Sequence, residues 1–584
     1  MESTILPLTW PDGFDPKDFK RFETEARTLR YQALGRACRD MKITRLMVAH
    51  HADDQAETVM MRLANNRLRS GLQAMQRKEW IPECEGIYGV YHSGRYQKPS
   101  PSLDIPFPVE QGGIQILRPL LTFEKTRLIA TCEEKGVAWA EDKTNQIRTL
   151  TSRNAIRHIY KNHKLPEALS VKSLVDVSQH MQERIKRHKT LANKLFDKCL
   201  IKLDIQTGCL VVRFPPFSDL LPRPIYTEAD KIDKIQAKNT AYCLIERVAE
   251  LVTPRSKAPL GQLAATVYRI YPELEDLEED EEPGHWNGVR KKNYCVYSVW
   301  WRFWDQPSPF DKRKHREEGI NPSLPHPREW LLTRQPLDTN ERAGTDNHIV
   351  YPPSRTVSRP PPRETYRLFD GRYWIQLRNF LTHDTLILRI FSKDDMRYLP
   401  TYQQNKTQMQ GSDASRPYRY IIAAFDLLKP TDLRFTLPAV FRKDSVMGEE
   451  TLIGFPTLDV RIDGFGAPEG ICEWSVRYKK IDFGSRSPGD LIVPGSSRKD
   501  IIAEEMRGRL VLEGVDKARM LKKKQQQQRE ETSSDTFTGY KRVVHVDGRD
   551  RKRREWKAAA ENVQNSMQAE EAVGLGFLEE ESKR

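Results

Sequence analysis

The sequence predicts an α/β fold in its N-terminal part and a β-rich fold in its C-terminal part. Helical patterns at Phe22–Cys38 and Phe123–Gly136 lie on either side of a short apolar run at 43–49, which is typical of a strand in a parallel sheet. Apolar and polar residues alternate, as in β-strands, between about 364 and 481. We therefore expect five regions: 1–165, an α/β domain with a doubly wound parallel sheet; 166–282, a helical region; 283–363, a Trp-rich strand and a Pro-rich linker; 364–518, a β-rich, mixed α+β region; and 519–584, a disordered, low-complexity basic tail.

Length and charge limit the classes of protein that fit. With 584 residues the chain is long enough for two to four domains and at least one sizeable core. Lysine and arginine number 95 against 81 aspartate and glutamate, a net charge of +14. This excess favours a polyanionic partner such as nucleic acid, although solubility alone would also explain it.

The cysteines and the apolar runs indicate in which cellular compartment the protein is expected. Eight cysteines are scattered without a C-x-x-C pair or a His/Cys cluster of zinc spacing, which predicts reduced, intracellular thiols. No run of eighteen apolar residues and no secretion or transit signal is present, so we expect no membrane association. A mitochondrial and a cytoplasmic location both remain open.

The first elements follow in order along the chain. The run ILPLTW (residues 5–10) predicts a strand, and Phe22–Cys38 predicts a helix. The apolar run Arg45–Ala49 predicts a strand buried on both faces of the sheet. The proline-rich stretch Gln97–Gly113 predicts an inserted surface loop.

The stretch HHADDQAET (residues 50–58) follows the predicted strand directly. Asp54 and Glu57 have capping-box spacing, which predicts a helix start at Asp54. His50, His51, Asp53 and Asp54 then lie at the carboxyl end of a parallel strand, where open α/β sheets bind ligands. Helix capping alone would account for Asp54 and Glu57, but not for the two histidines.

The later regions carry weaker signals. A helix is predicted at 174–199, a strand at Cys209–Phe214 and a helical pair at 240–271, before an acidic run at Glu273–Glu282. Further predictions are a Trp-rich strand at Tyr294–Trp304 and strands at Tyr373–Leu377, Leu386–Ile390 and Phe435–Phe441.

Six ordered segments give a family resemblance. HHADDQAET resembles the characteristic motif of the tRNA(Ile)-lysidine synthetases, a branch of the PP-loop or N-type ATP pyrophosphatases. The other five segments are similar to the flanking signatures of the same family: EARTLRY (25–31), SGLQAM (70–75), RPLL (118–121), WAEDKTN (139–145) and RNAIRH (153–158). Further along, RFTLPAVF (434–441) followed by LIGFPTLDV (452–460) loosely resembles the paired strands of the family's small C-terminal domain.

The resemblance implies a PP-loop ATPase fold, similar to the adenine nucleotide alpha-hydrolases, and a two-step reaction. ATP would adenylate the oxygen at C2 of a wobble cytidine and release pyrophosphate, and the ε-amine of lysine would then attack C2 and expel AMP. The implied cofactors are ATP and Mg²⁺. The implied partners are tRNA(Ile) with a CAU anticodon and free L-lysine, with no membrane partner and with a homodimer left open.

The resemblance also implies roles for individual residues. Carboxylates suit Mg²⁺ or an amine, and arginines suit phosphates. Asp54 and Asp53 are the expected catalytic residues, with Asp54 as the magnesium ligand. The ATP pocket is expected to be shaped by His50, His51 and Gln55. Contacts with phosphate or tRNA are expected from Arg118, Arg153, Arg157, Asp142 and Asn145.

Several of these residues also have a structural explanation. Arg153 and Arg157 are four apart on one helix face and could simply be solvated. Asp142 and Asn145 could cap the following helix, and the charged residues at 25–30 could form an ordinary helix surface.

One departure from the family pattern concerns ATP. The S-G-G-x-D-S loop that cradles pyrophosphate in PP-loop enzymes is absent, and neither QGG (111–113) nor GVYHSGR (89–95) replaces it. Because the family places this loop before all of the elements above, we expect a chain without its first strand, phosphate loop and first helix, and therefore an incomplete sheet. The alternative function is a non-catalytic tRNA-binding protein. Cytidine thiolation is disfavoured because that chemistry needs paired cysteines.

Three basic or aromatic segments could contact RNA beyond residue 165. Each has a common structural alternative, namely a solvated surface, a packed core or a targeting patch. They are the helix around Arg184, Lys186, Arg187 and Lys189; the strand RKKNYCVYSVWWRFW (290–304); and the cluster RDRKRREWK (549–557).

Overall fold

The computed structural model describes the greater part of the chain up to residue 494. The described residues are 3–11, 19–95, 105–140, 152–221, 231–256, 260–274, 293–306, 308–310, 321, 325–338, 341–342, 344, 347–354, 366–398, 431–461 and 471–494. The predicted tail at 519–584 and the predicted site residues Asp142 and Asn145 lie outside these residues.

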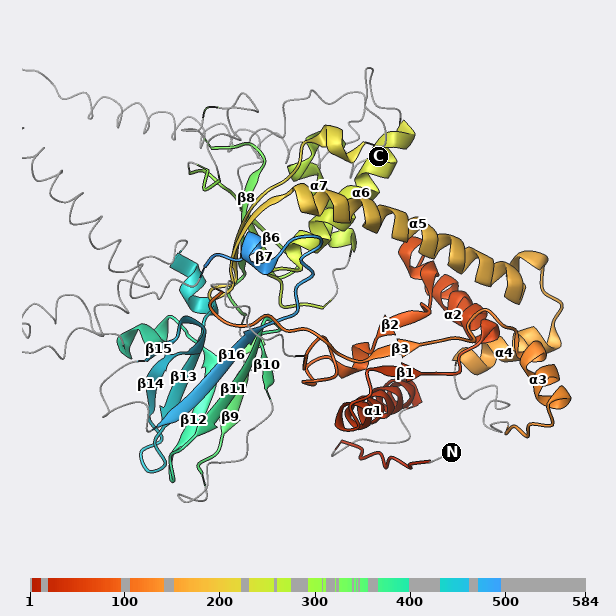
Figure 1. Ribbon diagram of the computed structural model, residues 1–584, viewed down its shortest axis with the longest axis horizontal. Helices are drawn as coiled ribbons and strands as arrows, with labels where there is room; N and C mark the ends of the chain where they lie inside the picture. The colour runs from red at the N-terminus through yellow and green to blue at the C-terminus, as the bar shows by residue number, and fades with distance from the viewer. Residues whose placement is uncertain are drawn as a thin grey trace, which may run out of the picture. The chain divides into compact units, whose positions relative to one another are not determined.

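The N-terminal part combines a small sheet with helices (Figure 1). Its elements are α1 (Phe19–Asp40), β1 (Arg45–Met47), α2 (Ala52–Ala64), β2 (Lys78–Trp80), β3 (Gln115–Leu117), α3 (Lys125–Glu134) and α4 (Ser152–Asn162). Figure 1 shows α1 along one face of the sheet, where Tyr31 and Cys38 pack with Ile81, Ile114 and Ile116. The helices predicted around 22–38 and 123–136 are confirmed.

The sheet differs from the prediction in two respects. Its strand order is β1-β3-β2, with β1 parallel to β3 but β2 antiparallel to it, so the sheet is mixed and not purely parallel. The predicted strand at 43–49 is present as β1, but Met47 is 71% exposed and the expected burial on both faces is wrong. Within the described part of the chain β1 has β3 as its one neighbour, which leaves it at an edge.

The strand predicted at 5–10 is also wrong. This segment pairs with no strand in the described part of the chain, and Ile5 is 93% exposed. Its aromatic residue Trp10 instead stacks on Phe22 of α1, with ring centroids 5.2 Å apart. An apolar run alone cannot specify a strand unless a partner supplies the backbone hydrogen bonds.

The middle of the chain joins helices to a five-stranded antiparallel sheet of order β4-β5-β8-β7-β6. The elements are α5 (Val171–Lys198), β4 (Leu200–Asp204), β5 (Cys209–Arg213), α6 (Lys231–Ala249), α7 (Ala264–Ile270), β6 (Tyr294–Val296), β7 (Val299–Phe303) and β8 (Glu329–Arg334). The predicted long helix, the strand at 209–214 and the helical pair are confirmed. Helix α5 also packs against α2, where Ala56 and Val59 meet Leu174.

The Trp-rich segment at 294–304 forms a hairpin and not the single strand predicted. Tyr297 and Ser298 both have positive φ, 59° and 56°, and β6 pairs with β7 on either side of them. Two consecutive residues in this conformation make the tight turn that suits the twist of a β-hairpin. Trp301 is fully buried, so this tryptophan is a core residue.

The C-terminal described part is β-rich, as predicted. One sheet has the order β10-β11-β16 and the other β15-β14-β13-β12-β9. The predicted pairing of 434–441 with 452–460 is confirmed by antiparallel β13 and β14. The elements are β9 (His348–Tyr351), β10 (Arg367–Phe369), β11 (Tyr373–Asn379), β12 (Thr385–Ile390), β13 (Pro438–Lys443), β14 (Glu450–Phe455), β15 (Val460–Arg461), β16 (Cys472–Tyr478) and α12 (Pro488–Leu491).

Two general features complete the fold. None of the helices that the structure describes has both the length and the apolar composition that crossing a membrane requires. All eight cysteines carry free thiols.

Candidate active site at the start of α2

Helix α2 begins three residues earlier than its capping pattern predicts. His51 is the N-cap, and its backbone N–H donates to Asp54 Oδ2 over 3.1 Å. Asp54 is therefore the third helical residue, which reaches back to the cap, and it is not the cap itself. The predicted position of the cap was wrong because carboxylates stand at both 54 and 57. Only the direction of the chain after β1 determines which of the two lies in the first turn of the helix. This register leaves Glu57 in the second turn, where its carboxylate can bind another element.

Glu57 fastens α4 to α2. Its Oε1 accepts from Arg157 Nε at 2.6 Å, and its Oε2 lies 3.3 Å from Arg153 Nε. Arg157 Nη2 also lies 3.4 Å from Asp54 Oδ1. Arg153 and Arg157 do share one face of α4, but they are ion-paired residues and not a solvated pair.

Burial acts strongly on this carboxylate. The Glu57 side chain is largely enclosed, and burial raises its pKa above the ordinary value even though Arg157 and Arg153 lower it. Burying a carboxylate at this depth without neighbouring cations would cost a large electrostatic free energy. The two arginines therefore compensate the buried charge of Glu57, and Glu57 in turn fixes the orientation of both arginines.

His51 lies between two carboxylates. Its Nδ1 is 3.4 Å from Asp53 Oδ2, and its Nε2 is 3.5 Å from Asp54 Oδ2. The hydrogen bond with Asp53, together with the charges of Asp54, Asp53 and Glu57, raises the pKa of His51 against the effect of burial. Asp53 also accepts the backbone N–H of Lys125 at 2.8 Å, so it holds the start of α3. Burial acts to raise the pKa of Asp53, but the bonds from His51 and Lys125 lower it.

His50 has the opposite electrostatic character. Burial lowers its pKa to about 4; Asp54 opposes this shift, whereas Arg118, Arg153 and Arg27 add to it. Its Nδ1 is buried and has no hydrogen-bond partner in the described part of the chain. His50 is consequently a neutral imidazole at pH 7.

Gln55 occupies a packed position. Its Nε2 donates to Ser178 Oγ at 2.7 Å and to the Met75 carbonyl at 3.0 Å, while its Oε1 accepts from the Met75 N–H at 3.1 Å. It is 2% exposed. These bonds join α2 to α5 and to the segment SGLQAM, so the structure gives Gln55 a structural role. Its predicted contact with ATP remains a prediction.

Arg118 is also buried, at 3% exposed. One nitrogen, Nη1, donates to Glu79 Oε2 and to the Gln76 carbonyl, both at 2.8 Å. Its Nε has no partner among the residues that the structure describes. The guanidinium is near enough to lower the pKa of His50, and its predicted role at phosphate or tRNA remains a prediction.

The sequence did not identify three residues that help to shape this cluster. Thr58 Oγ1 accepts from Arg153 Nη2 at 3.3 Å, Glu79 holds Arg118, and Ser178 holds Gln55. Glu57 was recognised, but as a cap. One signal could have shown its role, because Arg153 and Arg157 have the four-residue spacing that lets two cations on one helix reach a common anion.

Comparison with known proteins bears directly on this segment. Residues 10–163 match the family of PP-loop domains. The N-terminal part of the chain is a PP-loop domain, similar to that of the tRNA(Ile)-lysidine synthases. Proteins named tRNA(Ile)-lysidine synthase are similar to part of the chain, and the similarity also covers only part of each relative.

Three relatives show the extent of the similarity. The probable tRNA(Ile)-lysidine synthase of Schizosaccharomyces pombe is 36% identical over 163 residues, 28% of this chain and 31% of the relative. The tRNA(Ile)-lysidine synthase of Chlorobaculum tepidum is 32% identical over 127 residues, 22% of this chain and 28% of the relative. That of Lactiplantibacillus plantarum is 29% identical over 213 residues, 36% of this chain and 38% of the relative. The chain thus spans about a third of the length of these relatives.

The family implies ATP use, and the cluster is suited to a magnesium ion that enters with ATP. In the described part of the PP-loop domain no three His, Cys, Asp or Glu side chains gather as a metal cage. Mg²⁺ in nucleotide enzymes needs only one or two carboxylates, because phosphates and water complete its shell. Asp53 and Asp54, which converge on His51, supply that number.

Proposed function

We propose that this protein is a tRNA(Ile)-lysidine synthase. It would use ATP to adenylate the C2 oxygen of the wobble cytidine in tRNA(Ile) with a CAU anticodon, with release of pyrophosphate. The ε-amine of free lysine would then form a bond to C2 and AMP would leave. The observation that carries this proposal is the gathering of the motif residues at the start of α2, within the segment that matches the family.

The cationic side of the cluster suits the adenylation step. Negative charge builds up on phosphate oxygens in this step, and fixed cations stabilise it most when they need not reorganise. Arg153 and Arg157 are fixed by Glu57, and their guanidinium groups present several N–H donors each. In this proposal the two arginines, and Arg118 behind them, face ATP or the tRNA backbone.

The anionic side suits the lysine step. Asp53 and Asp54 place two carboxylates around a single imidazole, and this part of the site would attract an ammonium group. Asp54 and Asp53 would orient the lysine amine or hold Mg²⁺, which would neutralise phosphate charge when bound. His50, which is neutral, would offer a hydrogen bond to the base or the amine without adding charge.

A basic surface on α5 suits the tRNA. Arg184, Lys186, Arg187 and Lys189 are all exposed. Lys186 and Arg187, together with Lys194, border a hollow of about 730 Å³ along the helix. Lysines and arginines in such an arrangement contact phosphates and supply affinity that falls with salt.

The proposal is tested by lysine transfer. Full-length protein purified from its own cells would be mixed with ATP, Mg²⁺, radiolabelled lysine and unmodified tRNA(Ile) with a CAU anticodon. Label in the tRNA is the expected result, and a tRNA with a GAU anticodon, which lacks the wobble cytidine, should remain unlabelled. Retained tRNA binding without label and without ATP–pyrophosphate exchange would overturn the proposal and indicate a binding protein.

A further inference from the structure

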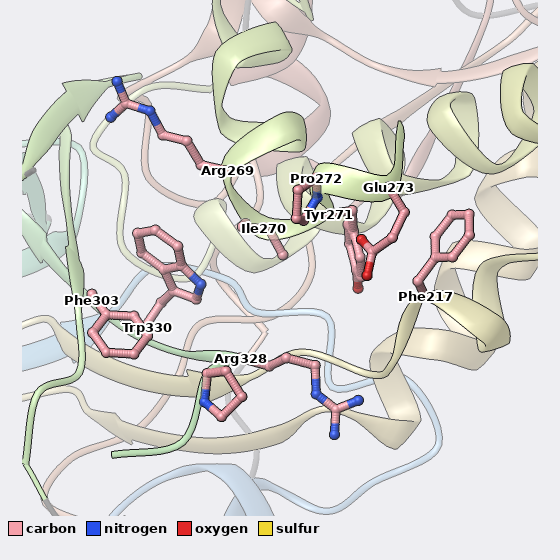
Figure 2. Close-up of a pocket in the computed structure, with 10 residues that line it drawn as sticks. Phe217, Arg269, Ile270, Tyr271, Pro272, Glu273, Phe303, Arg328 and Trp330 are labelled. Carbon is pink, nitrogen blue, oxygen red and sulfur yellow. The ribbon is translucent and has the colours of Figure 1, made fainter. Parts of the chain in front are cut away.

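A second pocket lies away from the motif residues. It has a volume of about 420 Å³ and is formed where α7 ends, at the loop before β8 and at the end of β7. Figure 2 shows Phe217 at one end and Trp330 with Phe303 at the other, while Tyr271, Glu273 and Arg328 lie between them. Pockets that bind small molecules are commonly of this size.

The aromatic walls are held in fixed positions. Trp330 is 2% exposed and is packed edge-on by Phe303, at 6.0 Å and 89°, and by Tyr294, at 6.1 Å and 77°. Phe303 and Phe217 are only partly buried, so each retains ring surface toward the pocket. Rigid aromatic surfaces of this kind bind a flat ring by stacking.

Two side chains of the pocket carry polar atoms without protein partners. Trp330 Nε1 is buried and has no hydrogen-bond partner in the described part of the chain. Neither do Nε and Nη1 of Arg269, whose guanidinium lies 3.9 Å from the centroid of the Tyr294 ring. A buried donor without a partner is destabilising, so a ligand that carries an acceptor would gain from binding here.

Charge indicates the class of ligand. Arg328 is the cation beside the aromatic side chains, because Figure 2 shows the guanidinium of Arg269 directed away from them; one exposed carboxylate, Glu273, also lines the pocket. The ligand should therefore combine a flat ring, an acceptor at the ring edge and a negative charge. A nucleotide has all three properties, whereas a proline-rich peptide, which also binds aromatic surfaces, lacks the negative charge.

We propose that this pocket binds one nucleotide of a single-stranded RNA. The base lies against the aromatic walls, a ring nitrogen or carbonyl accepts from Trp330 Nε1, and the adjoining phosphate lies at Arg328. Since the pocket shares no residue with the cluster at α2, this inference stands whether or not the protein makes lysidine.

Photocrosslinking tests the site directly. Full-length protein would be irradiated with an RNA hexanucleotide that contains 4-thiouridine, and the adducts would be located by mass spectrometry. Adducts on Phe217, Phe303 or Trp330 are the expected result. Adducts confined to other parts of the chain, α5 included, would overturn the proposal.

Binding measurements with matched variants supply the second test. Phe217→Leu removes a stacking surface at a partly exposed position, and Arg328→Gln removes a charge; we expect each to weaken hexanucleotide binding at least about fivefold. Phe217→Tyr keeps the aromatic ring and should bind the hexanucleotide as tightly as the natural protein. Lys443→Gln, which removes an exposed charge on β13, should also leave this affinity unchanged. Unchanged affinity in Phe217→Leu and Arg328→Gln would contradict the proposal, as would displacement of the RNA by a proline-rich peptide.

Competition by mononucleotides identifies the source of the ligand. Displacement of the hexanucleotide by millimolar CMP or AMP would show that the pocket accepts a free nucleotide as well as a base in a strand. Resistance to CMP and AMP, combined with the expected adducts, would show that the pocket requires the strand. Either result supports a nucleotide site.

Discussion

Glu57 and Arg157 form a charge-assisted hydrogen bond of 2.6 Å between two helices that are far apart in the sequence. The same carboxylate also reaches Arg153, so a single acidic side chain fixes both arginines of the RNAIRH segment. This arrangement connects the HHADDQAET motif to a second signature of the family. In the proposed function, Glu57 is a positioning residue that acts on the site through Arg153 and Arg157.

Glu57→Gln should therefore impair catalysis more than folding. The amide keeps the size of the side chain but loses the charge that holds Arg153 and Arg157, and small displacements of such groups reduce rates by as much as about 100-fold. We expect kcat/KM for lysine transfer to fall by about 10- to 100-fold, as measured with labelled lysine. Glu133→Gln on the exposed face of α3 is the matched control and should retain full activity. Equal activities of the two variants would contradict the role of Glu57.

Substitutions at Asp54 should separate its two functions. Asp54→Asn retains an oxygen that can accept the His51 N–H, whereas Asp54→Ala removes this cap bond, which is worth about 1 kcal/mol. We expect both variants to lose lysine transfer while retaining tRNA in filter binding. Only Asp54→Ala should also show a lower melting temperature. Retained activity in Asp54→Asn would refute a catalytic or magnesium-binding role.

Gln55→Leu should lower stability. The substitution leaves the backbone N–H of Met75 without its acceptor, whereas the Met75 carbonyl keeps the bond from Gln182 Nε2; a group left unpaired in this way costs about 1–3 kcal/mol. We expect a clearly lower melting temperature and faster proteolysis, with little change in the KM for ATP. A raised KM at unchanged stability would instead place Gln55 at the nucleotide.

The two neighbouring histidines should titrate in opposite directions. Burial keeps His50 neutral down to a pKa of about 4, whereas the bond with Asp53 raises the pKa of His51 above its ordinary value. Hydrogen–deuterium exchange at the histidine C2 position, followed against pH by mass spectrometry, measures both values. Equal pKa values near 6.5 would contradict the environments described here.

The raised pKa of His51 also has a consequence for stability. The folded protein binds this proton more tightly than the unfolded chain does, so the contribution is fully present below pH 6.5. It is lost as the pH rises through the folded value. The stability difference between the natural protein and His51→Gln, measured by urea unfolding, should therefore be largest in mild acid. A difference that grows toward alkaline pH would have the wrong sign.

The basic face of α5 should contribute to tRNA affinity by neutralising phosphates. Lys186→Gln with Arg187→Gln should weaken binding and reduce the slope of log K against log salt by about 0.7–0.9 for each phosphate that is no longer neutralised. Lys443→Gln provides the control for removal of a surface charge elsewhere. An unchanged slope would show that α5 does not face the RNA backbone.

The sequence alone predicted the elements whose signals are local. The helical periods of α1, α3 and α5, the strand β1 and the paired strands β13 and β14 are all present close to their predicted positions. The motif at 50–58 also located the candidate site. These predictions succeeded because hydrophobic period and residue order are properties of short segments.

Tertiary structure decided what depends on distant partners. The start of α2 at His51, the burial of Gln55 against Ser178 and the turn at Tyr297–Ser298 each required contacts or backbone angles that no short pattern specifies. Likewise, the carboxylate of Glu57 could serve as a cap or as an anchor until α4 came within reach. The physical reason is that a buried polar group takes the partners that the fold brings to it, across about a hundred residues in this case, and the pairing becomes visible only when the helices are in place.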